Sequence, residues 1–163
     1  DLRGLVGITE PIVRFWFDRG LSREVHRRLH DAADVPGTAD HERVPGFITA
    51  AALALASEEP ASAYRSASKA VAAARAADAG GALAVALGQR AFSGAMSGLP
   101  TGAQVDADVE QALQLAERGE DASTHAYVLA LAEGCRRAKE TGDSEEKDRS
   151  LGFHCSSFLC NTI

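Results

Sequence analysis

The sequence predicts an all-α protein of about seven helices, arranged as stacked antiparallel helical hairpins. Residues 47–79 contain two stripes of apolar residues at helical spacing, separated by a turn. Similar stripes and turns recur on both sides of this segment, and alanine, the best helix former, fills many of the apolar positions. A single hairpin cannot bury its own apolar face, so each hairpin needs a similar neighbour.

Composition sets the size and the class of the protein. A length of 163 residues corresponds to about one domain, and 45% apolar with 6% aromatic residues indicates a core of small aliphatic side chains. The net charge of −6, without a densely basic helix, argues against direct binding of nucleic acid. The longest uncharged runs, residues 44–57 and 91–105, are shorter than the ~18–20 residues that span a membrane.

The chain begins at Asp1 without an initiator Met or a signal-peptide pattern, so we expect a piece of a longer cytoplasmic protein. An odd number of cysteines does not form a disulfide framework; these residues are Cys135, Cys155 and Cys160.

Residues 2–20 are compatible with an opening helical region, in which Pro11 starts a helix or kinks a continuous one. Trp16 lies among bulky rings, at least one of which should face a partner element. We expect Trp16 to pack on the second helix or on a preceding domain, and it is a candidate anchor for a partner. The second helix starts at Ser22, and its predicted buried stripe is Val25, Leu29 and Ala32.

The central hairpin follows a turn-rich linker at residues 34–41. Its first helix should start between residues 40 and 46, with Pro45 in the first turn. Glu58-Glu59-Pro60 forms the turn, and Gly80-Gly81 should belong to the break at residues 78–81. The two predicted apolar stripes are Phe47, Ala50, Ala51 and Ala54, then Ala63, Ala67, Ala70 and Ala74.

A third hairpin and one further helix complete the predicted array. A long turn at residues 97–102 separates the two helices of the hairpin, and Gly119 ends the second helix. The last helix covers about residues 122–140. The partner helix expected after it is absent or degenerate, so a flank near Val128 and Leu131 should be exposed. The predicted stripes are Leu83, Leu87 and Ala91; Val105, Val109, Ala112 and Ala116; and Val128, Leu131 and Cys135.

The pattern fails after Asp143, which defines two segments: a helical repeat domain at residues 1–143 and an irregular tail at 144–163. The tail matches neither the helix period nor the composition before it. We interpret it as non-native to the repeat, through truncation or a shifted reading frame.

The two-helix unit resembles a tetratricopeptide repeat, whose period is ~34 residues. The first helix of that family has large, small and large residues at the positions that Phe47, Ala51 and Ala54 occupy here. The family's Leu-Gly pair is matched by Leu87-Gly88. Ala54 and Ala67 replace larger family residues, so the packing should be thinner. The resemblance implies a right-handed α-solenoid with a concave binding face.

The motif Phe15-Trp16-x-x-Arg19-Gly20-Leu21-x-x-Glu24 resembles the segment that follows the ATPase module in large LuxR-type and cyclase-linked transcriptional regulators. Val25 and Arg28 depart from that family, which has glycine and tryptophan there. The resemblance implies a sensor segment whose partners include the ATPase and DNA-binding modules of the parent chain, neither of which lies in this chain.

Motifs for catalysis are missing or incomplete. No GxxxxGK[ST] occurs, so the chain should not bind ATP, and after His41-Glu42 a proline stands where a zinc protease needs its second histidine. His26 and His30 are spaced to share a metal, but Arg23 and Arg27 favour a solvated face instead. His154, Cys155 and Cys160 supply one ligand fewer than a structural zinc site requires.

We therefore expect no enzymatic activity, no cofactor and no metal, and a function in binding a protein, a peptide or a small effector. Arg65 and Lys69, one helical turn apart, are candidates to receive an acidic peptide, although an exposed outer face is the more common role of such pairs. Cys135 should be a buried, inert thiol. The alternatives are a stand-alone scaffold or adaptor, and a helical enzyme domain with an active site among His26, His30 and the acidic residues.

Overall fold

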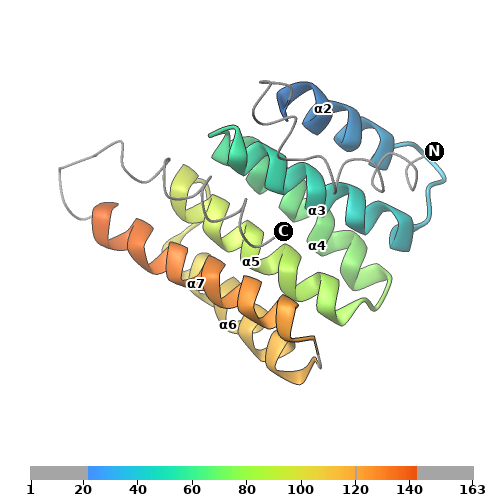
Figure 1. The fold of residues 1–163 in the computed structure, drawn as a ribbon. Coiled ribbons are helices and arrows are strands. Elements are labelled where there is room, and N and C mark those ends of the chain that lie inside the picture. The colour runs from blue at the N-terminus through green and yellow to red at the C-terminus, as the bar shows by residue number, and fades with distance from the viewer. Residues whose placement is uncertain (1–21, 120, 143–163) are drawn as a thin grey trace.

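The structure, a computed structural model, describes residues 22–119 and 121–142 (Figure 1). The described residues form six α-helices and no strand, which confirms the all-α prediction. The expected opening helical region, Trp16 and the tail at 144–163 lie outside the described residues. The helices are α2 (Ser22–Ala33), α3 (Asp40–Ala56), α4 (Pro60–Ala76), α5 (Gly80–Ser97), α6 (Gly102–Arg118) and α7 (Ala122–Gly142).

Each helix packs on the next one along the chain, and α5 also contacts α3 and α7, which are two helices away (Figure 1). Helix α4 therefore spans the junction of α3 and α5, and α6 spans the junction of α5 and α7. Helices α3, α5 and α7 begin at residues 40, 80 and 122, so the two-helix unit is 40 and then 42 residues long. This unit is longer than the ~34 residues of a tetratricopeptide repeat.

Small side chains form most of the contacts between the helices. The predicted stripe of four alanines on α4 is fully buried, and Phe47 and the three alanines of the α3 stripe are buried with it. On α2, Leu29 and Ala33 are buried, whereas Val25 and Ala32 are only partly covered, so the predicted stripe is shifted at its end.

Helices α5 and α7 approach each other closely at two glycines. A Cβ atom added at Gly88 would lie 3.0 Å from Cδ1 of Leu131, and one added at Gly134 would lie 2.7 Å from the ring of Phe92. Val128 and Leu131 are therefore covered by α5, with exposed fractions of 1% and 5%. Leu129, between these two residues, is 50% exposed, so the expected exposed apolar flank is found at Leu129, whereas α5 covers Val128 and Leu131 themselves.

Helix α3 begins at Asp40, within the predicted range of residues 40–46, but the predicted places of Gly80-Gly81 and of Pro45 are wrong. Gly80 and Gly81 lie in the first turn of α5, and the break is shorter because Asp78 adopts a positive φ of 50°. Pro45 is the sixth residue of α3 rather than a first-turn residue. Pro45 and His41 are both exposed there, so water can satisfy the carbonyl oxygen that the proline leaves without a partner.

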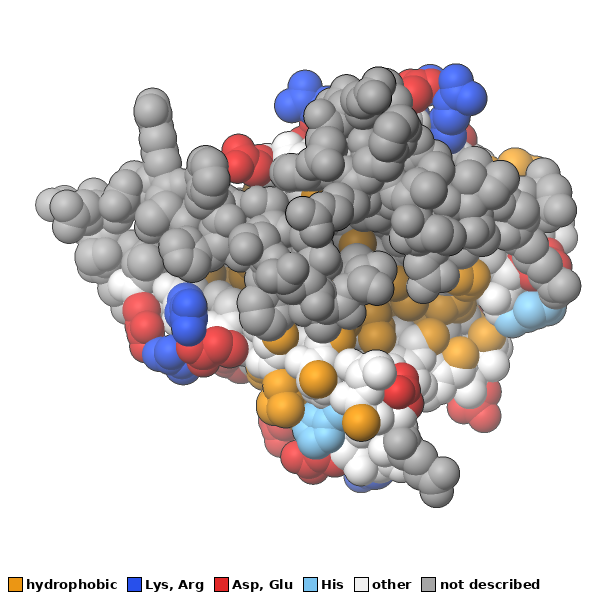
Figure 2. Space-filling view, viewed as in Figure 1, with side chains coloured by type: hydrophobic (Ala, Val, Ile, Leu, Met, Phe, Trp, Pro, Cys, Tyr) orange, Lys and Arg blue, Asp and Glu red, His pale blue; other side chains and the backbone are white. Residues whose placement is uncertain are grey.

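No helix among the described residues is long and apolar enough to cross a bilayer. Viewed from the same side as Figure 1, the described part of the surface shows apolar side chains near its centre and charged side chains mainly toward its edges (Figure 2).

Candidate functional site

A pocket of ≈ 350 Å³ lies between α2, which packs on α3, and the start of α4. Helix α2 supplies one wall, and the start of α4 with the turn before it supplies the other. The pocket combines three guanidinium groups, two imidazoles, two carboxylates and two hydroxyls. These groups belong to Arg23, His26, Arg27, His30, Asp31, Glu59, Ser62, Arg65 and Ser66. The volume is near the lower end of the roughly 300–1,000 Å³ that small-ligand sites occupy.

Leu29 fixes the orientation of α2 because it is fully buried with Ala50 and Leu53 of α3. Residues one turn apart share a face of a helix, so His26 and His30 flank Leu29 and point toward α3 and α4. The ring of His30 lies edge-on to the ring of Phe47, with 5.7 Å between their centroids.

The predicted solvated face for the two histidines is thus wrong. Nε2 of His26 lies 3.3 Å from Oγ of Ser66 on α4, and the side chain of His30 is 26% exposed. The two histidine rings are 6.2 Å apart. Packing of α2 on α3 brings the two histidines close to the start of α4, so that they form one side of a pocket.

Burial lowers the pKa of both histidines, because removing an imidazolium from water disfavours its charged form. Neighbouring cationic groups add to the effect. His30 and Arg65 lower the pKa of His26, and Lys69 and Arg65 lower the pKa of His30, while nearby carboxylates oppose these shifts. Both rings are therefore neutral at neutral pH.

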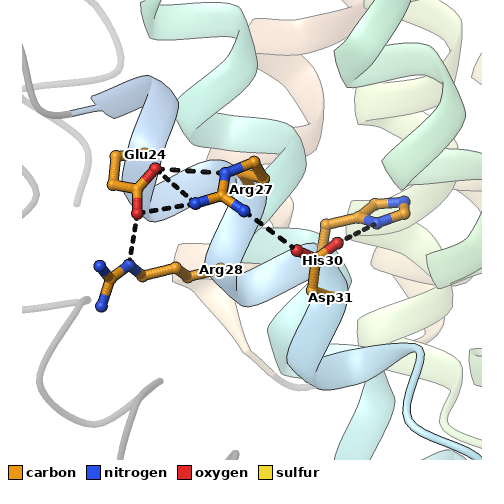
Figure 3. A network of polar contacts seen from close by, with 5 residues as sticks. All are labelled: Glu24, Arg27, Arg28, His30 and Asp31. Atoms are coloured by element: carbon orange, nitrogen blue, oxygen red, sulfur yellow. Dashed lines mark hydrogen bonds and ion pairs between the residues drawn. The ribbon is translucent and has the colours of Figure 1, made fainter.

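An ion-pair network holds the charged side chains of α2 (Figure 3). Arg27 and Arg28 both donate to Glu24, and this contact lowers the pKa of the Glu24 carboxyl, with Arg28 as the larger cause. Arg27 also lies 3.7 Å from Asp31, whose other oxygen is 4.0 Å from Nδ1 of His30.

Arg65 and Lys69, the two interaction residues predicted from sequence, have different surroundings. Lys69 forms an ion pair with Asp34 and lies 5.6 Å from the centroid of the Phe47 ring, so it ties the end of α2 to α4. Arg65 is exposed on the pocket wall and donates from Nη2 to Oγ of Ser62 at 3.0 Å. Within residues 22–119 and 121–142, no carboxylate forms an ion pair with Arg65.

Among the described residues, the pocket contains no exposed serine beside a histidine and no group of three metal-ligating side chains. Ser66 and His26 are close enough to act as nucleophile and base, but Ser66 is fully buried, so a substrate carbonyl would not reach its Oγ. In the part of the chain that the structure describes, no three His, Cys, Asp or Glu side chains are grouped to hold a metal ion.

A second polar cluster, between α5 and α6, is structural in character. Nε and Nη2 of Arg90 donate to the two oxygens of Asp108 at 2.7 Å each, and Nε2 of Gln104 donates to Oδ1 at 2.8 Å. Cys135 is buried as predicted, and burial raises the pKa of its thiol to about 12.

Sequence reasoning named Arg65 as a candidate contact but did not place it beside His26, because 39 positions separate the two residues. The only signal in the sequence was the four-residue spacing of His26 and His30. Comparison of this chain with protein-family models, curated proteins and solved structures gave no match.

Proposed function

We propose that this chain is a non-catalytic recognition module made of stacked helical hairpins, similar to a tetratricopeptide solenoid. Its partner is a protein segment, a peptide or a small effector. By the resemblance of residues 15–24, the parent protein is an ATP-dependent regulator of the LuxR type, with ATPase and DNA-binding modules outside this chain. The module would bias the ATPase by binding its resting and active states with different affinity.

The order of packing among α3, α5 and α7 is the observation that supports this proposal. Each of these helices is the first of a unit, and α5 contacts the equivalent helix on either side. Such a succession of similar units generates the extended surface that solenoid proteins use for binding. Units of 40 and 42 residues depart from the tetratricopeptide period, so the likeness concerns the two-helix plan rather than the repeat length.

The polar groups of the α2–α4 pocket favour recognition over bond cleavage. Its side chains are mostly engaged with one another, its two imidazoles are half-buried, and Ser66 is fully covered. Arg65, in contrast, is exposed at the pocket wall and is suited to contact a partner.

The first test of this proposal is a screen of the full chain against ester, amide and phosphate-ester substrates. We expect turnover no faster than in buffer. Turnover that is lost in His26→Ala would contradict a non-catalytic role and favour the helical enzyme domain.

The second test concerns the parent regulator. The reading frame on both sides of this segment should encode ATPase and DNA-binding modules. In the parent, Arg65→Glu should change the rate of ATP hydrolysis, whereas Arg75→Glu on the same helix should not. A reading frame without an ATPase module would refute the regulator assignment and favour a stand-alone scaffold.

A further inference from the structure

We propose that the pocket between α2 and α4 binds a phosphate group, with Arg65 as the main contact and His26 beside it. This inference rests on the proposed recognition function, because it names the chemical class of ligand that the module takes at this pocket.

The charge of the pocket favours an anion. Three arginines and two acidic residues line it, which leaves a net charge of +1 with both histidines neutral, in a chain whose net charge is −6. Both carboxylates are already engaged: Glu59 lies 2.6 Å from Nε of Arg23, and Asp31 contacts Arg27 and His30. Arg65 is the guanidinium that remains for a ligand.

The donors around Arg65 suit a phosphate in particular. A guanidinium presents several N–H groups in a plane and binds two oxygens of one phosphate at once. Because the hydroxyl of Ser62 accepts a hydrogen bond from Arg65, its own hydrogen is free to donate to a third oxygen. The volume of ≈ 350 Å³ holds a phosphate and the part of the molecule that carries it.

This arrangement makes binding depend on pH through His26 and His30. A bound dianion favours the imidazolium forms, so binding takes up protons and strengthens as the pH falls below about 6.5. The charged groups that face the two rings come from α2, the loop after it, the α3–α4 turn and α4. They are Arg23, Arg27, Asp31, Asp34, Glu59, Arg65 and Lys69.

The test titrates the full chain with sodium sulfate at constant ionic strength, and follows the side-chain NMR signals of Arg65, His26 and His30. Sulfate keeps its two charges across the pH range used, so any change of affinity with pH must come from titration of groups on the protein. We expect saturable shifts, and an affinity at least about fivefold higher at about pH 6 than at about pH 8.

Matched variants locate the site. Arg65→Gln should weaken sulfate binding at least about fivefold, since one pocket cation and its paired donors are lost. Arg75→Gln removes the same charge from the far end of α4 and should leave binding unchanged. The double variant His26→Gln/His30→Gln should remove most of the pH dependence. Thermal melting by circular dichroism verifies that every variant is folded at each pH.

Equal, non-saturating shifts in Arg65→Gln and Arg75→Gln would overturn the proposal, since they indicate general screening of surface charge. So would equal affinity for a phosphoserine peptide and for the same peptide with glutamate in place of phosphoserine. Tighter binding of the phosphoserine peptide than of glycerol phosphate supports a protein partner, and the reverse order supports a small effector.

The outcome separates this inference from the proposed function. Failure of sulfate to bind removes the phosphate ligand, while a silent substrate screen and a response of the parent to Arg65→Glu would still support recognition. Turnover that depends on His26 would remove the recognition function, whatever sulfate does.

Discussion

Asp108→Ala is expected to lower the free energy of unfolding by about 3 kcal/mol. Asp108 is 3% exposed and accepts three hydrogen bonds, two of them from Arg90 and one from Gln104. Loss of one partner of a buried ion pair costs roughly 3–5 kcal/mol, because the other charge stays uncompensated. We expect the lower end, since the side chain of Arg90 keeps 16% of its surface exposed and can reach water.

Urea unfolding followed by far-UV circular dichroism measures this change. For a chain of this length, about 3 kcal/mol corresponds to a decrease in Tm of roughly 6–12 °C. Asp106→Ala is the matched control, because Asp106 lies on the same helix and pairs with Lys139 at the exposed surface. Asp106→Ala should lower the free energy of unfolding by about 1 kcal/mol or less.

The double variant Arg90→Met/Asp108→Leu tests the cause. Apolar residues of similar volume often replace a buried pair without loss, so the double variant should recover to within about 1 kcal/mol of the original chain. The reasoning is refuted if Asp108→Ala costs no more than Asp106→Ala, or if the double variant is as unstable as the single one.

Gly134→Ala should lower the free energy of unfolding by about 1 kcal/mol, because the clash of a methyl group 2.7 Å from an aromatic ring of α5 outweighs the gain in helix propensity. The control Gly81→Ala places its methyl group in open space and should not destabilise the protein. Urea midpoints that shift equally in both variants would contradict the close approach of α5 and α7. Because the pKa of both His26 and His30 is lowered, the stability they contribute is complete above about pH 6.5 and declines as the pH falls through that value towards their folded-state pKa. In thermal melts, the Tm of His26→Gln/His30→Gln should fall less with decreasing pH than the Tm of the original chain. An equal fall in both proteins would show that these two histidines do not cause the pH dependence. Burial raises the pKa of Cys135 to about 12, so this thiol should react with a thiol reagent at about pH 8 only after unfolding. Mass spectrometry should find Cys135 unmodified in the folded chain and modified in the unfolded chain.

The sequence predicts the hairpins well because their cores depend on local spacing. Alanines three and four residues apart on α4 must share one helix face, and all four are buried. The turn at Glu58-Glu59-Pro60 is also close to the observed boundary, because proline is favoured in the first turn of a helix.

Contacts between distant segments were not predictable in the same way. Arg90 and Asp108 are 18 residues apart, and nothing in the local pattern distinguishes them from exposed charges. The α2–α4 pocket likewise depends on how α2 packs, which the spacing of its own residues does not determine. Gly80 and Gly81 show a related error, since glycine disfavours a helix but is tolerated in the first turn when neighbouring contacts decide the boundary.

A disulfide trap between α5 and α7 tests the stacking of equivalent helices most directly. A Cβ at position 88 would lie 3.6 Å from Cβ of Leu131, within the range of about 3.5–4.5 Å that a disulfide requires. With the native cysteines replaced by serine, the pair Gly88→Cys/Leu131→Cys should therefore close within one chain under mild oxidation of the folded protein. The control pair Gly81→Cys/Leu131→Cys should stay reduced. If the first pair stays reduced as well, or links only separate chains, α5 and α7 do not lie side by side, and the proposed stack of hairpins is wrong.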